Sequence, residues 1–160
     1  MIIKQVTDTD FINYKKPSMF IIFPRCSFKC DHENNRKVCQ NSSLANLPNV
    51  SVTVEDLVQL YESNPITEAV VCGGLEPLDS FEDLLSFIIY FRYRSCDDIV
   101  IYTGYMEEEV IEKIQTLSLY ENIIVKFGRF IPNCESHFDE ILGVKLASPN
   151  QYAKYIGDII

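Results

Sequence analysis

The stretch that decides the fold is MFIIFPRCSFKC at residues 19–30, an apolar run that ends at a pair of cysteines. Its first half is apolar on both faces, which predicts a buried β-strand of a parallel sheet. A third cysteine follows in VCQN at residues 38–41. We therefore expect the strand to lead directly into a loop that gathers Cys26, Cys30 and Cys39.

Three clustered thiolates favour a metal centre with one ligand position left open. Structural zinc sites usually take four ligands and pair them at CxxC spacing. Cysteine thiolates also hold iron–sulfur clusters, and a cluster held by three of them keeps one iron free. Zinc, and buried thiols with no metal, remain the alternatives at this point. The other three cysteines are scattered, and we expect them to be structural: Cys72, Cys96 and Cys134.

The composition limits the classes of protein to consider. The chain has 160 residues, 47% of them hydrophobic, and a formal net charge of -9. We expect one globular domain over residues 1–160. Basic clusters that would bind nucleic acid are missing from the sequence. The sequence also has neither a bilayer-spanning apolar run nor a signal-peptide pattern at its N-terminus, so we expect a cytoplasmic protein with no membrane or nucleic-acid partner.

Strand and helix patterns alternate along the chain. Apolar runs predict three more strands, at residues 69–72, 99–102 and 123–127. We expect three helices, two of them following the capping sequences Thr53-Val-Glu-Asp56 and Ser80-Phe-Glu-Asp83. The third should run from Glu107 through Leu117, with four apolar residues on one face: Val110, Ile111, Ile114 and Leu117. Residues 132–137 read as loop and residues 152–156 as an edge strand. The fold class is thus α/β, an open or partial (β/α) barrel with a mostly parallel sheet.

Three features follow strands of this sheet, and in such folds ligands bind at the carboxyl ends of the strands. The cysteine loop follows the first strand. Gly73 and Gly74 end the second, and Glu76 comes just after them. Thr103 follows the third. Paired glycines let a ligand approach the main chain closely, and a glutamate could hold an ammonium group. The alternative is that Gly-Gly is an ordinary turn.

These motifs together resemble radical S-adenosylmethionine (SAM) enzymes, which carry a CxxxCxxC signature and a later Gly-Gly-Glu-Pro-like segment. More closely, the chain is similar to the activating enzymes of anaerobic ribonucleoside-triphosphate reductase. Besides the cysteine loop, the matching segments are CGGLEP at 72–77, YTGY at 102–105, GRF at 128–130 and ASPNQ at 147–151. Two departures stand out. Eight residues separate Cys30 from Cys39 where the family has two, and Leu75 is inserted before Glu76.

The resemblance implies a single radical SAM domain with a 4Fe–4S cluster on Cys26, Cys30 and Cys39, whose fourth iron binds SAM. Reductive cleavage of SAM would give a 5′-deoxyadenosyl radical that takes hydrogen from a glycine of a partner protein. We expect that glycyl-radical protein to be the anaerobic reductase, and a low-potential donor such as flavodoxin to supply the electron. The expected cofactor-binding residues are Val38, Cys39, Gln40, Gly73, Gly74, Glu76 and Thr103.

Two other readings of the sequence stay open. A radical SAM enzyme with a metabolite substrate, resembling 7-carboxy-7-deazaguanine synthase, is also small and can have an enlarged cluster loop. A non-catalytic iron–sulfur or zinc-binding module would use the same cysteines without cleaving SAM.

Overall fold

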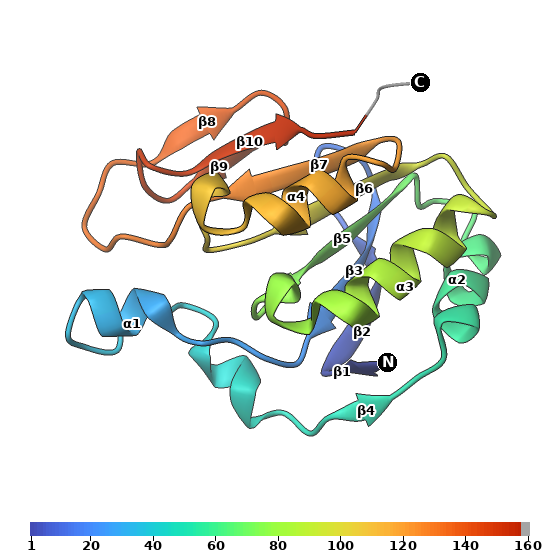
Figure 1. The fold of residues 1–160 in the computed structure, drawn as a ribbon, viewed down its shortest axis with the longest axis horizontal. Helices are drawn as coiled ribbons and strands as arrows, with labels where there is room; N and C mark the ends of the chain where they lie inside the picture. The colour runs from blue at the N-terminus through green and yellow to red at the C-terminus, as the bar shows by residue number, and fades with distance from the viewer. Residues whose placement is uncertain (158–160) are drawn as a thin grey trace.

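The central feature of the protein is a six-stranded sheet, seen in a computed structural model that describes residues 1–157 (Figure 1). Its strand order is β10-β7-β6-β5-β3-β2. The four inner strands are mutually parallel and confirm the predicted runs: β3 (Ser18–Phe23), β5 (Ala69–Gly74), β6 (Asp98–Tyr102) and β7 (Ile123–Phe127). Two antiparallel strands form the edges, the predicted β10 (Tyr152–Tyr155) and the unpredicted β2 (Gln5–Asp10).

Because β2 and β10 leave the sheet with two edges, the sheet is open. The expected α/β class and mostly parallel sheet are confirmed, and the strands do not close into a barrel. β2 escaped the sequence analysis because its residues, QVTDTD, are mostly polar and none of them is fully buried. Such an edge strand lacks the apolar pattern that identifies the inner ones.

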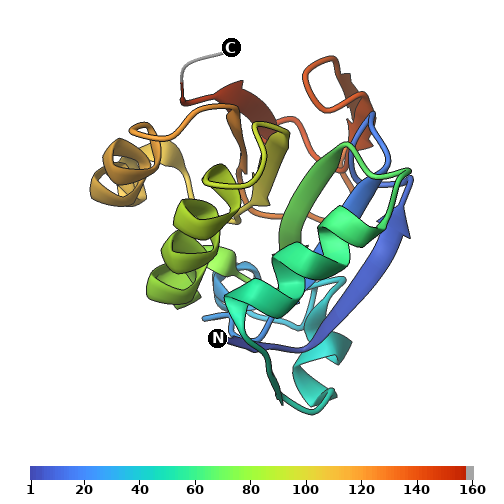
Figure 2. The same ribbon diagram turned by 90° about the vertical axis from the view of Figure 1, so that its right-hand side faces the viewer.

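Three helices cover one face of the sheet and connect its parallel strands: α2 (Val54–Ser63), α3 (Phe81–Arg92) and α4 (Ile111–Leu117) (Figure 2). Thr53 caps α2 as predicted, its hydroxyl accepting from the Asp56 amide at 3.0 Å. Ser80 precedes α3 but caps nothing with its side chain. A 3₁₀ turn, η2 (Pro77–Ser80), leads into α3, and Glu76 caps that turn instead.

The third helix starts later than the sequence predicted. The acidic triplet forms a 3₁₀ turn, η3 (Glu107–Glu109), and α4 begins only at Ile111. Val110, Ile114 and Leu117 are buried as expected, whereas Ile111 is 54% exposed. The break between the two helical segments rotates Ile111 away from the sheet.

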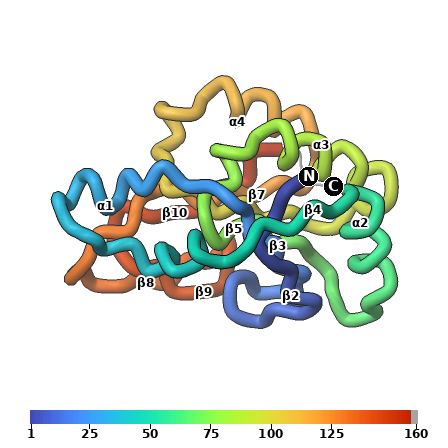
Figure 3. The backbone as a smooth tube through the Cα atoms, turned by 90° about the horizontal axis from the view of Figure 1, so that it is seen from below, coloured from blue at the N-terminus to red at the C-terminus, as the bar shows by residue number. Residues whose placement is uncertain are grey.

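The opposite face of the sheet carries a short hairpin, β8 (His137–Asp139) and β9 (Val144–Leu146). Leu142 and Leu146 from this region pack on Val71, Val100 and Ile124. The smaller elements are the pair β1 (Ile2–Ile3) and β4 (Val50–Ser51), the helix α1 (Lys29–Glu33) and the 3₁₀ turn η1 (Ser42–Asn46). α1 lies apart from the three-helix layer (Figure 3). Every helix within residues 1–157 is too short or too polar to cross a bilayer.

Candidate metal and cofactor site

A cavity of about 430 Å³ lies at the carboxyl ends of the parallel strands, on the face opposite the three helices. It is lined by parts of the cysteine loop, by the ends of β5, β6 and β7, and by the segment that follows β9. The sequence predicted that the strand-end motifs would meet, and the cavity lining includes seven of the predicted site residues: Cys26, Cys30, Cys39, Gln40, Gly74, Glu76 and Thr103. Gln40 and Lys145 are exposed, so the cavity opens to the surface.

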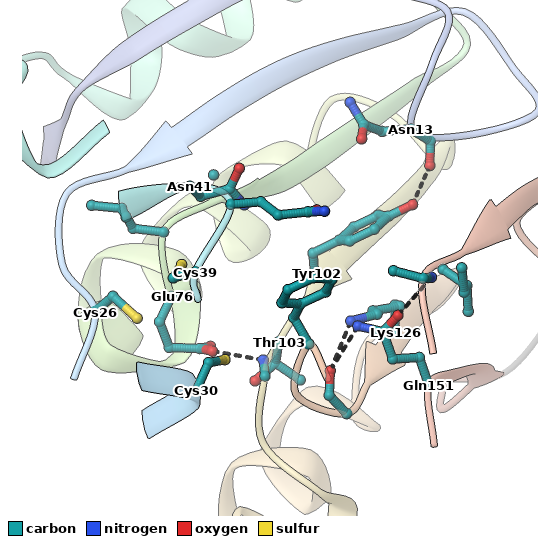
Figure 4. Close-up of a pocket in the computed structure, with 18 of the residues that line it drawn as sticks. Asn13, Cys26, Cys30, Cys39, Asn41, Glu76, Tyr102, Thr103, Lys126 and Gln151 are labelled. Atoms are coloured by element: carbon teal, nitrogen blue, oxygen red, sulfur yellow. Dashed lines mark hydrogen bonds between the residues drawn. The ribbon is translucent and has the colours of Figure 1, made fainter. Parts of the chain in front are cut away.

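The three cysteines reach the cavity from three parts of one loop. Cys26 follows β3 closely, Cys30 lies in α1, and Cys39 comes after the eight inserted residues. All three are half-buried free thiols, and they lie around Glu76 on one side of the cavity (Figure 4). Within residues 1–157, no three His, Cys, Asp or Glu side chains converge tightly enough to hold a metal ion.

This donor set fits an iron–sulfur cluster. Each thiolate of such a cluster binds a different iron, so its ligands must face one cavity but need not meet at a point. Burial raises the pKa of the Cys26 thiol to about 12 and also raises that of Cys39. Metal coordination is the ordinary way to deprotonate such thiols. Cys72 is buried, whereas Cys96 and Cys134 are exposed, and none of the three lines the cavity.

Glu76 joins the ends of two strands. Its carboxylate accepts the Leu78 amide at 3.1 Å and the Gly104 amide at 2.8 Å. The residue is only 5% exposed, and burial raises its pKa to about 7. The ammonium ligand expected from the sequence would therefore share a carboxylate that already fixes the turn after β6.

The fold itself requires glycine at the end of β5, at Gly73 and Gly74. Gly74 has φ +80, and a Cβ there would lie 2.6 Å from Cγ2 of Ile22. A Cβ at Gly73 would lie 3.0 Å from the Phe20 ring. These contacts come from the neighbouring strand β3, so the turn needs glycine whether or not a ligand binds. Gly74 lines the cavity, and Gly73 does not.

Two further predicted cofactor-binding residues, Thr103 and Val38, differ in their position relative to the cavity. Thr103 is 2% exposed, lines the cavity, and accepts the Tyr105 amide at 3.1 Å with its hydroxyl. Val38 is outside the lining, although it precedes Cys39 directly. Its amide donates instead to Asp31 at 2.7 Å.

Lys126, on β7, is the main residue of the cavity that the sequence analysis missed. The residue is 7% exposed, and its ammonium group donates to the Gly128 carbonyl at 2.8 Å. Burial lowers its pKa to about 8. Within residues 1–157 it takes part in none of the ion pairs. One signal could have identified it: a single lysine inside the apolar run IIVKF.

A network of charged and aromatic side chains fastens the cysteine loop to the sheet. The Arg129 guanidinium bonds Glu109 at 2.6 Å and Glu33 of α1 at 3.1 Å. The Tyr105 hydroxyl donates to Asp79 at 2.7 Å, and Asp79 accepts the Ser27 amide at 2.9 Å. The loop is thereby tied to elements that follow β5, β6 and β7.

Comparison with known proteins is consistent with this site. A search of curated proteins found no match for the chain. The sequence profile of one family, the 4Fe-4S single cluster domain, matches residues 18–146. This range begins with β3 and ends with β9, so it contains the three cysteines and all four parallel strands. The chain belongs to the 4Fe-4S single cluster domain family.

Proposed function

We propose that this iron–sulfur protein is a radical SAM activating enzyme that generates a glycyl radical on a partner protein, the anaerobic ribonucleotide reductase. In this proposal Cys26, Cys30 and Cys39 hold the cluster at one side of the cavity, and SAM occupies the rest of it. When bound, the cluster and SAM would supply the reductive cleavage that starts the radical chemistry. An electron donor such as flavodoxin and a reducing, cytoplasmic setting complete the proposal.

One observation carries the proposal: three cysteines and the turns after β5 and β6 line the same cavity. A cofactor spanning the cavity would contact the cysteine loop at one end and the strand ends at the other. Glu76, through its bond to the Gly104 amide, would hold those strand ends in place. No general base is required of the protein, because homolysis and hydrogen transfer need no proton acceptor.

Lys126 supports this assignment from the far side of the cavity (Figure 4). SAM carries a carboxylate, and Lys126 is a buried cation without an ion-pair partner among the described residues. Burying a charge without a counter-charge is costly, so a ligand anion would relieve that cost.

The size of the cavity favours a substrate that comes from outside. Ligand pockets of about 300–1,000 Å³ enclose one drug-sized molecule. A cavity of about 430 Å³ would thus be largely filled by the cluster and SAM together. A glycine-bearing loop inserted by a partner could then cover the open side and exclude water. A metabolite-transforming enzyme would need additional enclosed space.

The first test is cleavage of SAM by the anaerobically reconstituted, reduced protein, measured as 5′-deoxyadenosine. We expect cleavage by the wild type and by the Cys134→Ala variant, whose thiol is exposed, and none by Cys30→Ala. A wild-type protein that retains its cluster yet leaves SAM intact would contradict the enzyme assignment and favour a non-catalytic module.

The second test separates the two enzyme classes. Reduced protein, SAM and a candidate anaerobic reductase are mixed without oxygen, and the electron paramagnetic resonance (EPR) spectrum is recorded. The proposal predicts a glycyl-radical doublet on the reductase. SAM cleavage without a radical on any glycyl-radical partner, together with turnover of a small metabolite, would favour the metabolite-transforming alternative.

A further inference from the structure

The eight residues between Cys30 and Cys39 begin as the end of α1 and continue through a turn. A longer loop costs little closure entropy but has many more conformations from which to place its last residue. If Cys39 is a cluster ligand, something must fix its position relative to Cys30. The inserted segment itself contains a side chain that does so.

That side chain is Asp31, the residue after Cys30. One of its carboxylate oxygens, Oδ1, accepts both the Val38 amide and the Cys39 amide, each at 2.7 Å. These bonds cross from one end of the insertion to the other. Hydrogen bonds to an ionised acceptor are shorter and stronger than neutral ones.

The start of the insertion is fixed as well. The Asn34 side chain donates to the Cys30 carbonyl at 2.8 Å, and the Arg36 amide donates to the Asp31 carbonyl at 3.3 Å. Glu33 is tied to Arg129, beyond β7, at 3.1 Å. The segment is therefore attached to the sheet at α1, and its far end depends on Asp31.

We infer that Asp31 is a positioning residue that sets the place of Cys39 as the third cluster ligand and so makes the long insertion compatible with a three-cysteine site. The inference rests on the cluster ligands of the proposed function and not on SAM chemistry. Asp31 acts through the main chain of Cys39, and its own carboxylate remains an acceptor of amide protons.

The test measures how fast the reconstituted protein loses iron to a chelator under anaerobic conditions. Removing a partner that orients a metal ligand typically costs about 10–100-fold in metal affinity. We expect Asp31→Ala to accelerate iron loss by at least about tenfold on that basis. Asp31→Asn keeps an acceptor oxygen and should restore much of the retention. Asp10→Ala is the matched control, because Asp10, at the end of β2, likewise accepts two backbone amides, from Ile12 and Asn13.

A double variant distinguishes positioning from a general structural effect. If Asp31 acts through Cys39, adding Asp31→Ala to Cys39→Ala should change iron loss no further, whereas independent effects would add. Wild-type iron retention in Asp31→Ala, or an additive effect in the double variant, would overturn the inference. A wild type that keeps its cluster but does not cleave SAM would contradict the proposed function and leave this inference standing. A wild type that takes up no cluster would overturn both.

Discussion

Lys126 holds a positive charge where burial opposes it, and such residues are retained for binding more often than for stability. Lys126 lies in β7, and it lines the cavity. The hydrogen bond to the Gly128 carbonyl satisfies one donor but supplies no counter-charge. Lys126 should therefore destabilise the protein when the cavity is empty and stabilise the complex when an anion is bound.

The Lys126→Met variant tests this trade-off. Since burial lowers the pKa of Lys126 from 10.5 to about 8, burying its charge at pH 7 should cost on the order of 3 kcal/mol. We expect the cluster-free variant to be more stable than the wild type by that order in urea titration, while SAM binding to the cluster-loaded variant weakens at least about tenfold, or 1.4 kcal/mol.

Lys113→Met is the matched control for that experiment. Lys113 also donates to a backbone carbonyl, that of Leu78 at 2.6 Å, but it lies outside the cavity. Unchanged SAM affinity in Lys126→Met would remove the residue from the binding site. Weaker binding in both lysine variants would point to a general loss of charge.

At the level of elements, the end of β5 depends on Gly74. We expect Gly74→Ala to lower the free energy of unfolding by roughly 1–3 kcal/mol, because the new Cβ combines an unfavourable φ with a 2.6 Å approach to Ile22. Gly104→Ala, with no Cβ contact shorter than 3.7 Å and no positive φ, should cost much less. Urea denaturation of the cluster-free proteins measures both, and equal losses would contradict this reading of the strand end.

The ion pair between η3 and Arg129 gives a second test at this level. Hydrogen bonding to Arg129 lowers the pKa of Glu109 to about 2. A depressed carboxyl pKa stabilises the fold above the unfolded value of about 4.5, and that stabilisation is lost as the pH falls toward 2. The difference in melting temperature between wild type and Arg129→Met should therefore become smaller as the pH falls from about 4.5 toward 2.

A more exposed ion pair provides the control for Arg129→Met. Arg94 pairs with Glu62 at 2.8 Å, and the two side chains are 52% and 35% exposed. Exposed pairs contribute little, so Arg94→Met should leave the melting temperature nearly unchanged. A constant difference between wild type and Arg129→Met from pH 5 to 2 would show that the pair does not tie η3 to β7.

At the scale of the whole molecule, the sequence predicted the inner sheet because its strands are apolar on both faces. The same criterion overlooked the polar edge strand β2 and the three-residue strands of the hairpin, which carry too few residues for a pattern. It also placed Ile111 in the core, because periodicity cannot reveal a break between a 3₁₀ turn and a helix.

The candidate site was predicted in outline for a physical reason: carboxyl ends of parallel strands meet at one edge of a sheet. That rule located the cysteines, Gly74, Glu76 and Thr103. It could not locate Lys126, which lies within a strand, or reveal that Asp31 closes the insertion. The position of Lys126 in the cavity depends on how distant segments pack together. The bonds of Asp31 form within the loop, away from the strand-end motifs.

In the proposed function, three cysteines hold a 4Fe–4S cluster whose remaining iron binds SAM. The most direct measurement is the EPR spectrum of the reduced, reconstituted protein with and without SAM, alongside its iron and sulfide content. We expect one 4Fe–4S cluster per chain and a spectrum that changes when SAM is added. A fully loaded cluster whose spectrum is the same with and without SAM would contradict the proposed function.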